Sequence, residues 1–406
     1  MPLLQLQKHT GKIKCEIDLA SSKSESNRAL IINALAGNNS NLHRLANARD
    51  TATMQRLLSD MDAEVWDVLD AGTTMRFLTA FAAVKGLPKL MTGTARMQER
   101  PIALLIDALK ELGAEISYTK QEGYPPHTIE GFHFSGKNKL SIRGDVSSQY
   151  ISALLMIAPC LPEGLILELT GKIGSRPYID MTLNLMKHFG VEATWDYKKI
   201  IVPAQAYTSN EYTIEADWSG ASYWYSMAAL AEEAEIKLIG LRKDSFQGDS
   251  VLVDLMDQLG VKTTFEENGV LLTKKEHVSS LSWDFTHCPD IAQTIAVICA
   301  VKGISIQMLG LESLRIKETD RIDAIVQELK KFDVGCTVRG DEEIRIEKPN
   351  FQVKKNLINT YHDHRMAMAF APLALVTEIE IEDDSVVNKS YPDFWTDLKK
   401  AGFEMS

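Results

Sequence analysis

The sequence repeats a local pattern at nearly even spacing along its whole length, and this repetition limits the possible folds more than any other feature. One series consists of helix endings: a large apolar residue, two polar residues, an apolar residue, and then Gly or Asp. The six endings stand at similar intervals except for a shorter first one, at Asp62, Gly113, Gly190, Gly260, Asp333 and Gly402. Apolar residues at helical spacing precede each ending, and a β-like run usually follows. The pattern therefore predicts a helix followed by a strand as the repeating unit.

A second series marks the starts of helices that we expect to be buried. An aspartate stands just before each apolar run, at almost constant spacing: Asp70, Asp145, Asp217, Asp290 and Asp363. In that position an acidic side chain is well placed to cap the helix. Serines replace the aspartate in a sixth segment, SSKSESNRALIINALA, which begins at Ser21. Each unit thus supplies two helices and several short strands.

The length of the chain requires more than one domain. Hydrophobic cores stop growing near roughly 250 to 300 residues, and this chain has 406. Six units fit two domains of three units better than one long solenoid. Because the first interval is short and the chain stops directly after the sixth ending, we expect the N-terminal strand to complete the C-terminal domain. The predicted domains are residues 20–217, and residues 1–19 with 218–406.

Composition and charge exclude several classes of protein. Apolar residues make up 45% and charged residues 24%, as in soluble globular proteins. The net charge of −11 argues against extended binding to nucleic acid or to an anionic membrane. The first twenty residues lack the apolar core of a signal peptide, and the apolar stretch 366–376 is shorter than the about 20 residues that span a bilayer. We therefore expect a cytoplasmic protein without a membrane segment.

The distribution of cysteine and histidine does not indicate a metal site. The five cysteines are scattered without a CxxC pair, so neither a disulfide framework nor a thiolate site is expected. His362 and His364 are close in sequence, but Arg365 beside them would repel a cation. We predict no bound metal.

Two basic segments are candidates for anion binding. Lys23, Ser24 and Arg28 lie at a hydroxyl-rich helix start, where backbone N–H groups also favour phosphate or carboxylate. The alternative is a serine cap with solvated charges. Lys317 and Arg321 stand four apart on one helix face, and like charges at that spacing are unfavourable unless an anion or a nearby acid such as Glu318 offsets them.

The same theme recurs at other predicted helix starts. Arg100, His364 with Arg365, and Lys389 each stand where the positive end of a helix dipole favours anions. Any one of them taken alone is better explained as a surface charge. Uncharged candidates at such starts are Gly72, Ser147, Ser148, Gln149, Ser175 and Tyr178. Hydroxyl and amide groups there suit a phosphate or a polyhydroxylated ring, and helix capping explains the serines equally well.

Nine segments within residues 22–395 resemble, in order, the motifs of the 5-enolpyruvylshikimate-3-phosphate synthases: SKSESNRAL, DAGTTMR, RMQERPI, DVSSQYISALL, GSRPYIDMT, PDIAQT, LRIKETDRI, DHRMAM and KSYPDFW. An ordered series is more specific than any single motif. The resemblance implies the α/β (α+β) fold of the enolpyruvyl transferases: two domains, each an inside-out α/β barrel of three βαβαββ units, with the active site in the cleft between them.

The resemblance also implies substrates and the residues that meet them. For shikimate 3-phosphate these are Lys23, Ser24, Arg28, Ser147, Ser148, Gln149, Ser175, Tyr178, Asp290 and Lys317. For phosphoenolpyruvate they are Lys23, Gly72, Arg100, Gln149, Arg321, His364, Arg365 and Lys389. The implied catalytic set is Lys23, Asp290, Glu318 and His364.

The implied reaction adds the shikimate 5-hydroxyl to C2 of phosphoenolpyruvate, protonates C3, and then loses phosphate from a tetrahedral intermediate. It needs an acid and a base but no metal or cofactor, and Glu318 and Asp290 are expected to share proton transfer with help from Lys23. We expect a monomer whose partners are these two small molecules. The sequence departs from the family pattern at Ala20, Ser21, Asp70, Phe77 and Ser313, which bears on substrate affinity and on inhibition by glyphosate.

Two rival interpretations remain at this stage. The enolpyruvyl transferases that act on UDP-N-acetylglucosamine share the fold and the chemistry, but their usual cysteine is missing from the corresponding stretch TGTARMQERP. A noncatalytic ring of six repeats around nucleic acid would be of a different class, and the net charge of −11 weighs against it.

Overall fold

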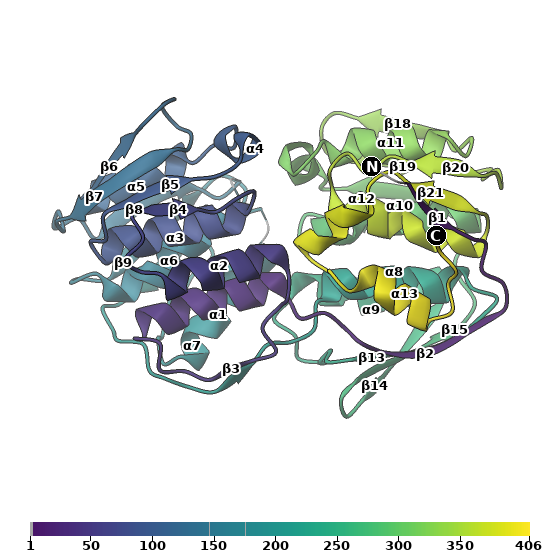
Figure 1. Ribbon diagram of the computed structural model, residues 1–406, viewed down its shortest axis with the longest axis horizontal. Helices are drawn as coiled ribbons and strands as arrows, with labels where there is room; N and C mark the ends of the chain where they lie inside the picture. Colours follow the sequence, from purple (N-terminus) through teal and green to yellow (C-terminus); the bar gives the residue numbers. More distant parts are fainter. Residues whose placement is uncertain (1–2, 146, 175) are drawn as a thin grey trace. The chain divides into compact units, whose positions relative to one another are not determined.

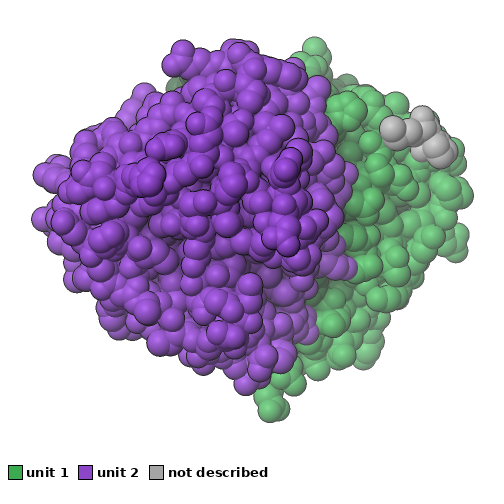
Figure 2. All heavy atoms as spheres, turned by 60° about the vertical axis from the view of Figure 1, so that its left-hand side comes forward, with its two compact units in different colours: residues 1–21, 215–406 green, residues 22–214 purple. Residues whose placement is uncertain are grey.

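Two compact units make up the chain in the computed structural model, which describes residues 3–145, 147–174 and 176–406. Unit 2 is residues 22–214, and unit 1 joins residues 1–21 to residues 215–406 (Figure 2). The repeat spacing puts the divisions at 19/20 and 217/218 instead. Near these divisions, the two segments of unit 1 are hydrogen-bonded to each other: the Asp217 N–H donates to the Ala20 carbonyl oxygen at 2.8 Å.

Four of the sheets share one strand pattern, which is the structural form of the sequence repeat. Each contains a parallel pair, then a strand antiparallel to the second member of that pair, then a further antiparallel strand. Unit 2 holds β4 (Val65–Asp67), β5 (Lys89–Thr92), β7 (His127–Phe132) and β6 (Ala114–Tyr118), and β8 (Lys139–Arg143), β9 (Leu165–Thr170), β11 (Lys199–Val202) and β10 (Thr194–Trp195). Unit 1 holds β2 (Lys12–Asp18), β13 (Glu233–Ile239), β15 (Gly269–Lys274) and β14 (Val261–Glu266), and β16 (Ser280–Asp284), β17 (Ser305–Leu309), β19 (Glu343–Ile346) and β18 (Cys336–Arg339).

Each unit has a third, smaller sheet that joins distant parts of the chain. In unit 2, β3 (Leu42–His43) pairs in parallel with β12 (Tyr212–Thr213). In unit 1, β20 (Asn356–Ile358) pairs in parallel with β21 (Ile379–Ile381), and β1 (Leu4–Leu6) adds to β21 in antiparallel register (Figure 1). The N-terminal strand therefore lies in the same sheet as strands from the last quarter of the chain.

A buried helix connects the two parallel strands in most of these sheets, as parallel pairing requires a crossover. The connecting helices are α3 (Gly72–Val84) and α6 (Ser148–Ile157) in unit 2, and α10 (Ala292–Lys302) and α12 (His364–Phe370) in unit 1. Two further buried helices complete the set: α1 (Lys23–Leu35) follows β2, and α8 (Trp218–Leu230) precedes β13. Their starts follow the predicted aspartate series and the serine segment. Except for its last residue α8 is buried throughout, with two tryptophans and two tyrosines that anchor it in the core of unit 1.

The predicted aspartate caps are confirmed at two of five helices. Asp217 accepts from the Ser219 N–H and Asp363 from the Arg365 N–H, so both cap their helices. The prediction is wrong at Asp70, Asp145 and Asp290. Their cap positions are held by Ala71, Ser147 and Ile291, because each helix begins two or three positions beyond the aspartate instead of directly after it. The carboxylates of the first two bind arginines instead.

The second helices of the repeats lie on the outside and end near the predicted Gly or Asp. They are α2 (Arg49–Ser59), α5 (Ala103–Leu112), α7 (Arg176–His188), α9 (Leu252–Leu259), α11 (Arg321–Lys330) and α13 (Phe394–Lys400). The shorter elements are α4 (Ala95–Gln98), η1 (Ala158–Cys160), η2 (Gly248–Val251), η3 (Pro289–Ile291), η4 (Glu312–Ile316), η5 (Ala371–Leu375) and η6 (Asp384–Lys389). Within the described ranges, no helix combines the length and the apolar character that crossing a bilayer requires.

We expect Gly113→Ala to destabilise unit 2 strongly. Gly113 has φ 112°, and a Cβ at this position would meet the His133 carbonyl oxygen at 1.9 Å. The left-handed conformation costs a non-glycine residue about 1–2 kcal/mol, and overpacking typically adds about 1–3 kcal/mol. Gly136→Ala is the matched control, since its φ is 81° and no atom of the described residues lies within 4 Å of the added Cβ. Thermal unfolding should show a larger loss of midpoint for Gly113→Ala, and equal losses would contradict this explanation.

Candidate functional site

A buried arginine organises the charged groups of unit 1. Arg321, the first residue of α11, is 1% exposed. Its Nε donates to Asp363 Oδ2 at 2.7 Å, its Nη1 to Asp290 Oδ1 at 3.0 Å, and its Nη2 to Glu318 Oε2 at 2.9 Å. Although burial alone would lower its pKa, the three carboxylates raise the pKa of Arg321 above its ordinary value. The guanidinium is therefore a fixed positive charge at the centre of the group.

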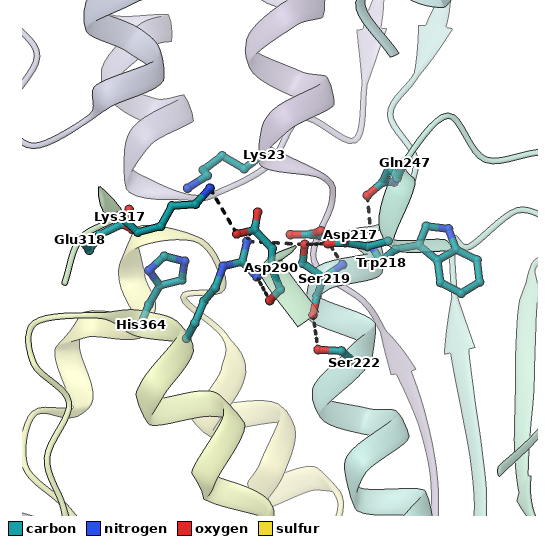
Figure 3. Close-up of polar contacts among 12 residues, drawn as sticks. Lys23, Asp217, Trp218, Ser219, Ser222, Gln247, Asp290, Lys317, Glu318 and His364 are labelled. Atoms are coloured by element: carbon teal, nitrogen blue, oxygen red, sulfur yellow. Dashed lines mark hydrogen bonds and ion pairs between the residues drawn. The ribbon is translucent and has the colours of Figure 1, made fainter. Parts of the chain in front are cut away.

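Three further cations surround the same carboxylates. Lys317 Nζ lies 3.7 Å from Asp290 Oδ1, and the two side chains point toward one another in Figure 3. Arg365 Nη2 lies 3.1 Å from Asp290 Oδ2, and Lys389 Nζ lies 3.6 Å from Glu318 Oε1. We call the seven residues the unit 1 cluster: Asp290, Lys317, Glu318, Arg321, Asp363, Arg365 and Lys389. Its four cations exceed its three carboxylates, so it suits an anionic ligand.

His364 lies at the edge of this cluster in a strained stretch of backbone. It is the first residue of α12, is 2% exposed, and its Nδ1 lies 3.6 Å from Asp363 Oδ1. The preceding residues Tyr361 and His362 have φ values of 53° and 56°, which side-chain-bearing residues rarely adopt. Glu328, buried in α11, holds this turn because its carboxylate accepts from the Tyr361 hydroxyl at 2.6 Å. The turn thus orients His364 and Arg365.

In unit 2, the starts of four helices are joined by polar contacts. Lys23 Nζ, at the start of α1, lies 3.3 Å from Asp50 Oδ2 in the first turn of α2. The Thr74 hydroxyl of α3 donates to the Asp50 carbonyl oxygen at 3.1 Å. Gln149 Nε2, at the start of α6, donates to Thr73 Oγ1 at 2.9 Å. The positive ends of these helix dipoles therefore lie together with a lysine.

Gly72 gives two arginines close access to the start of α3. A Cβ at Gly72 would lie 2.5 Å from Arg100 Nη1 and 2.8 Å from Arg76 Nη1. Two backbone carbonyl groups hold Arg76 in place: its Nη1 donates to the Gly72 carbonyl oxygen at 2.9 Å and its Nη2 to the Pro101 carbonyl oxygen at 3.2 Å. The missing side chain is thus a steric requirement for the position of the Arg100 guanidinium.

Arg28 joins three helices of unit 2. It is buried, and its Nε donates to Thr182 Oγ1 at 2.8 Å while its Nη2 donates to Ser152 Oγ at 3.0 Å. Its Nη1 donates to the Ser24 carbonyl oxygen at 2.8 Å, and the Tyr178 ring centroid lies 5.7 Å from its Cζ. Burial lowers the pKa of Arg28 to about 10, so it stays charged at neutral pH. These contacts bring Ser24, Arg28 and Tyr178 together.

Three predicted serines of unit 2 remain: Ser147, Ser148 and Ser175. Ser147 caps α6, accepting from the Gln149 N–H at 3.4 Å, and Ser148 is the buried first residue of that helix. The contact of Ser147 is therefore the helix cap that was the alternative interpretation of this serine. Ser175 lies outside the described residues.

Several buried polar residues in and around these groups were missed by sequence reasoning. Asp50 is the second residue of its helix, where an acid is common because it complements the dipole, so nothing distinguishes it in sequence. Asp363 was interpreted only as a cap, yet it also accepts from Arg321. Ser219 and Asp249 gave no signal because they lie 30 residues apart, and the contact of Glu328 with Tyr361 spans 33 residues. In the part of the chain that the structure describes, no group of three or more His, Cys, Asp or Glu is arranged to hold a metal ion.

Comparison with known proteins identifies the family. The family model described as EPSP synthase (3-phosphoshikimate 1-carboxyvinyltransferase) matches residues 7–70 and 64–398. The chain belongs to the EPSP synthase family. A 3-phosphoshikimate 1-carboxyvinyltransferase of Bacteroides fragilis strain YCH46 is 48% identical over 401 residues, covering 97% of this chain and 96% of the relative. The EPSP synthase relative from Haemophilus influenzae strain Rd is 37% identical over 418 residues, covering 95% of each chain.

Solved structures agree on the fold. An EPSP synthase from Acinetobacter baumannii superposes with a TM-score of 0.80 at 20% identity, covering 100% of this chain and 99% of that one. The enolpyruvyl transferase NikO from Streptomyces tendae gives a TM-score of 0.76 at 13% identity, with 100% and 98% coverage. The family resemblance and the expected enolpyruvyl transferase fold are thereby confirmed. The roles expected of the individual EPSP synthase site residues stay predictions.

Proposed function

We propose that this chain transfers the enolpyruvyl group of phosphoenolpyruvate to the 5-hydroxyl of shikimate 3-phosphate, the 3-phosphoshikimate 1-carboxyvinyltransferase reaction (EC 2.5.1.19) of chorismate and aromatic amino acid biosynthesis. The observation that carries the proposal is the unit 1 cluster, which combines four cations with Glu318 and Asp290 in one partly buried group. The names and the identity of the relatives support it.

The charges of the two substrates explain the need for clusters in both units. Each phosphate carries about −1.5 to −2 charges at neutral pH and needs several charge-assisted donors when it loses water. We assign phosphoenolpyruvate to Lys23, Gly72, Arg100, Gln149, Arg321, His364, Arg365 and Lys389. We assign shikimate 3-phosphate to Lys23, Ser24, Arg28, Ser147, Ser148, Gln149, Ser175, Tyr178, Asp290 and Lys317. A chain with a net charge of −11 binds such anions because the cations are concentrated at helix starts.

Proton transfer is assigned to carboxylates that stand beside cations. In the addition step, the 5-hydroxyl oxygen bonds to C2 of phosphoenolpyruvate as its proton leaves, and C3 gains a proton. In the elimination step, C3 loses a proton and the bond from C2 to the phosphate oxygen breaks. Glu318 and Asp290 share these transfers, and Lys23 and His364 complete the proposed catalytic set. Arg321 and Lys389 flank the Glu318 carboxylate at 2.9 and 3.6 Å, so they hold it in one orientation.

Two smaller parts of the proposal concern the state of the protein. The chain acts as a monomer, and the two small molecules are its partners. It works in the cytoplasm, where both substrates are made available by metabolism. Light scattering of the purified protein, with and without both substrates, checks the first part. A dimer in either condition would contradict it.

Phosphate release is the direct test of the proposed activity. The purified chain should release inorganic phosphate from phosphoenolpyruvate when shikimate 3-phosphate is present. With unphosphorylated shikimate the rate should be far lower, because the charge that the serines and Lys317 are proposed to bind is missing. Release that is independent of the acceptor would contradict the proposal.

We expect Gly72→Ala to weaken phosphoenolpyruvate binding more than it slows turnover. The added Cβ would lie 2.5 Å from Arg100 Nη1, so the guanidinium must move away from the start of α3. Displacing one charge-assisted contact costs about 1.5–3 kcal/mol, which corresponds to a rise in KM for phosphoenolpyruvate of about tenfold or more. Gly335→Ala is the control, because no atom of the described residues lies within 4 Å of its added Cβ. Steady-state kinetics in which both variants keep the wild-type KM would contradict the role given to Arg100.

A further inference from the structure

A buried carboxyl group outside the assigned site lies next to the unit 1 cluster. Asp249 is in η2, the short 3-10 helix that precedes α9, and it is 5% exposed. The Ser219 hydroxyl, at the start of α8, donates a hydrogen bond to Asp249 Oδ2. Neither residue is part of the site that the family resemblance indicates. A buried carboxyl needs a physical explanation, because burial disfavours its charged form.

Ser219 connects Asp249 to the cluster through Arg365. Arg365 Nη2 donates to Ser219 Oγ at 3.5 Å and lies 3.1 Å from Asp290 Oδ2. Arg365 Nη1 donates to the Asp290 carbonyl oxygen at 3.1 Å. The serine hydroxyl thus accepts from Arg365 while it donates to Asp249. Figure 3 shows Ser219 and Asp290 near one another in this arrangement.

The charge of Asp249 changes in the neutral pH range. Burial, and then the negative charge of Asp290, raise the pKa of Asp249 to about 7, while the Ser219 hydrogen bond and the Arg365 charge oppose the rise. Asp217, the cap of α8, adds to it. Cys288, just before η3, also faces this region, and burial raises its pKa to about 12, so the thiol stays neutral. Asp249 therefore gains or loses a charge near neutrality.

We propose that Asp249 is a positioning residue that acts on Arg365 through the Ser219 hydroxyl and sets the negative charge beside the anion-binding cluster of unit 1. In its protonated form it leaves the positive charge of Arg365 available to an anionic ligand. In its ionised form it competes with that ligand for Arg365 and repels it. The effect on phosphoenolpyruvate rests on the proposed function, because that function assigns this ligand to Arg365.

The Asp249→Asn variant tests the proposal, since asparagine keeps the shape and the acceptor but stays neutral. We measure KM for phosphoenolpyruvate in wild type and variant from about pH 6 to about pH 8, and at each pH divide the wild-type KM by the variant KM. The phosphate of the substrate also titrates in this range, but it does so equally for both proteins and cancels in the ratio. The ratio should rise about five- to tenfold with pH, as expected for one added charge in a partly buried site. A ratio that does not change with pH would overturn the proposal.

Two further variants separate the parts of the argument. Ser219→Ala removes the hydrogen bond that favours the ionised form of Asp249, so the rise in KM should move to higher pH. Asp254→Asn removes a charge from an exposed position in α9 and should leave the wild-type pH dependence unchanged. A Ser219→Ala profile identical to that of wild type would show that the hydroxyl does not connect Asp249 to Arg365.

A spectroscopic readout keeps this test independent of the proposed function. With carbon-13-labelled aspartate, wild type should show one carboxyl resonance that titrates near pH 7 and is missing in Asp249→Asn. If no such resonance is found, the proposal fails whatever the activity. If wild type has no turnover with both substrates at any pH, the proposed function fails, and the resonance still decides the charge of Asp249.

Discussion

Replacing Glu318 with glutamine should lower kcat by about 10²–10⁴-fold, the range over which a positioned acid or base contributes. Glutamine has the shape of glutamate and still accepts a hydrogen bond from Arg321 Nη2, which lies 2.9 Å from Glu318 Oε2. It cannot take up or give away the proton that the reaction moves. The dissociation constants of the two substrates should therefore change much less than kcat. Steady-state kinetics and titration calorimetry on the same preparation measure both.

The matched control for this variant is Glu342→Gln, at an exposed position after β18. It removes the same charge from the same unit and should leave kcat unchanged. An unchanged kcat in Glu318→Gln would remove this residue from proton transfer. An equal loss of binding and of turnover would mean instead that Glu318 serves to hold the neighbouring cations.

Replacing Arg321 with leucine should cost both stability and activity. The guanidinium is 1% exposed and binds three carboxylates, of which Asp363 is 0% exposed. Removing one partner of a buried ion pair typically costs about 3–5 kcal/mol, because an uncompensated charge stays behind. Turnover should fall below detection, because the same change removes a cation from the proposed phosphoenolpyruvate site. Chemical unfolding and phosphate release measure the two losses.

Arg315→Leu provides the comparison at a more exposed position. Arg315 also binds carboxylates, with its Nη1 2.8 Å from both Asp320 Oδ2 and Asp323 Oδ1, but one of these partners is 68% exposed. Such pairs contribute about 0–1 kcal/mol, so this variant should unfold close to wild type. Similar stability losses for the two arginines would contradict the central place given to Arg321.

The sequence predicts the helices better than it predicts what they hold. The even repeat and its two offset series are local signals, and both reappear as buried and outer helices because apolar spacing decides which face of a helix is buried. The cap assignment failed at Asp70 because it depends on one backbone position: Ala71 holds the cap, and Asp70 binds Arg49 at 2.9 and 2.8 Å. Shifts of one or two positions at helix ends are not encoded in periodicity.

The charged groups of the site were predicted one by one, but not their partners. Lys317, Glu318 and Arg321 were identified from neighbouring positions in one motif. That Asp363 and Asp290 converge on Arg321 depends on how α11, α12 and η3 pack, over separations of 42 and 31 residues. Asp249 and Glu328 were missed for the same reason, since a buried acid has no signature in a single sequence. The tertiary packing that supplies their partners is visible only in the structure.

Both units use the same arrangement of helix starts, which follows from their shared strand pattern. In unit 2 it gathers Lys23, Gln149 and the Gly72 backbone, and in unit 1 it gathers the unit 1 cluster. Because α3, α6, α10 and α12 each follow the first strand of a parallel pair, the repeat puts several helix starts at the same end of a unit. The positive ends of the helix dipoles then add to the cations there. Repetition of one unit thus gathers helix starts and cations at one end of each unit.

The identity of the acceptor is the most direct test of the proposed activity. The purified chain is incubated with phosphoenolpyruvate and either shikimate 3-phosphate or UDP-N-acetylglucosamine, and phosphate release and the product mass are measured. We predict phosphate release only with shikimate 3-phosphate, and a product heavier than that acceptor by one enolpyruvyl group. Release with the nucleotide sugar alone, or with neither acceptor, would contradict the proposed function.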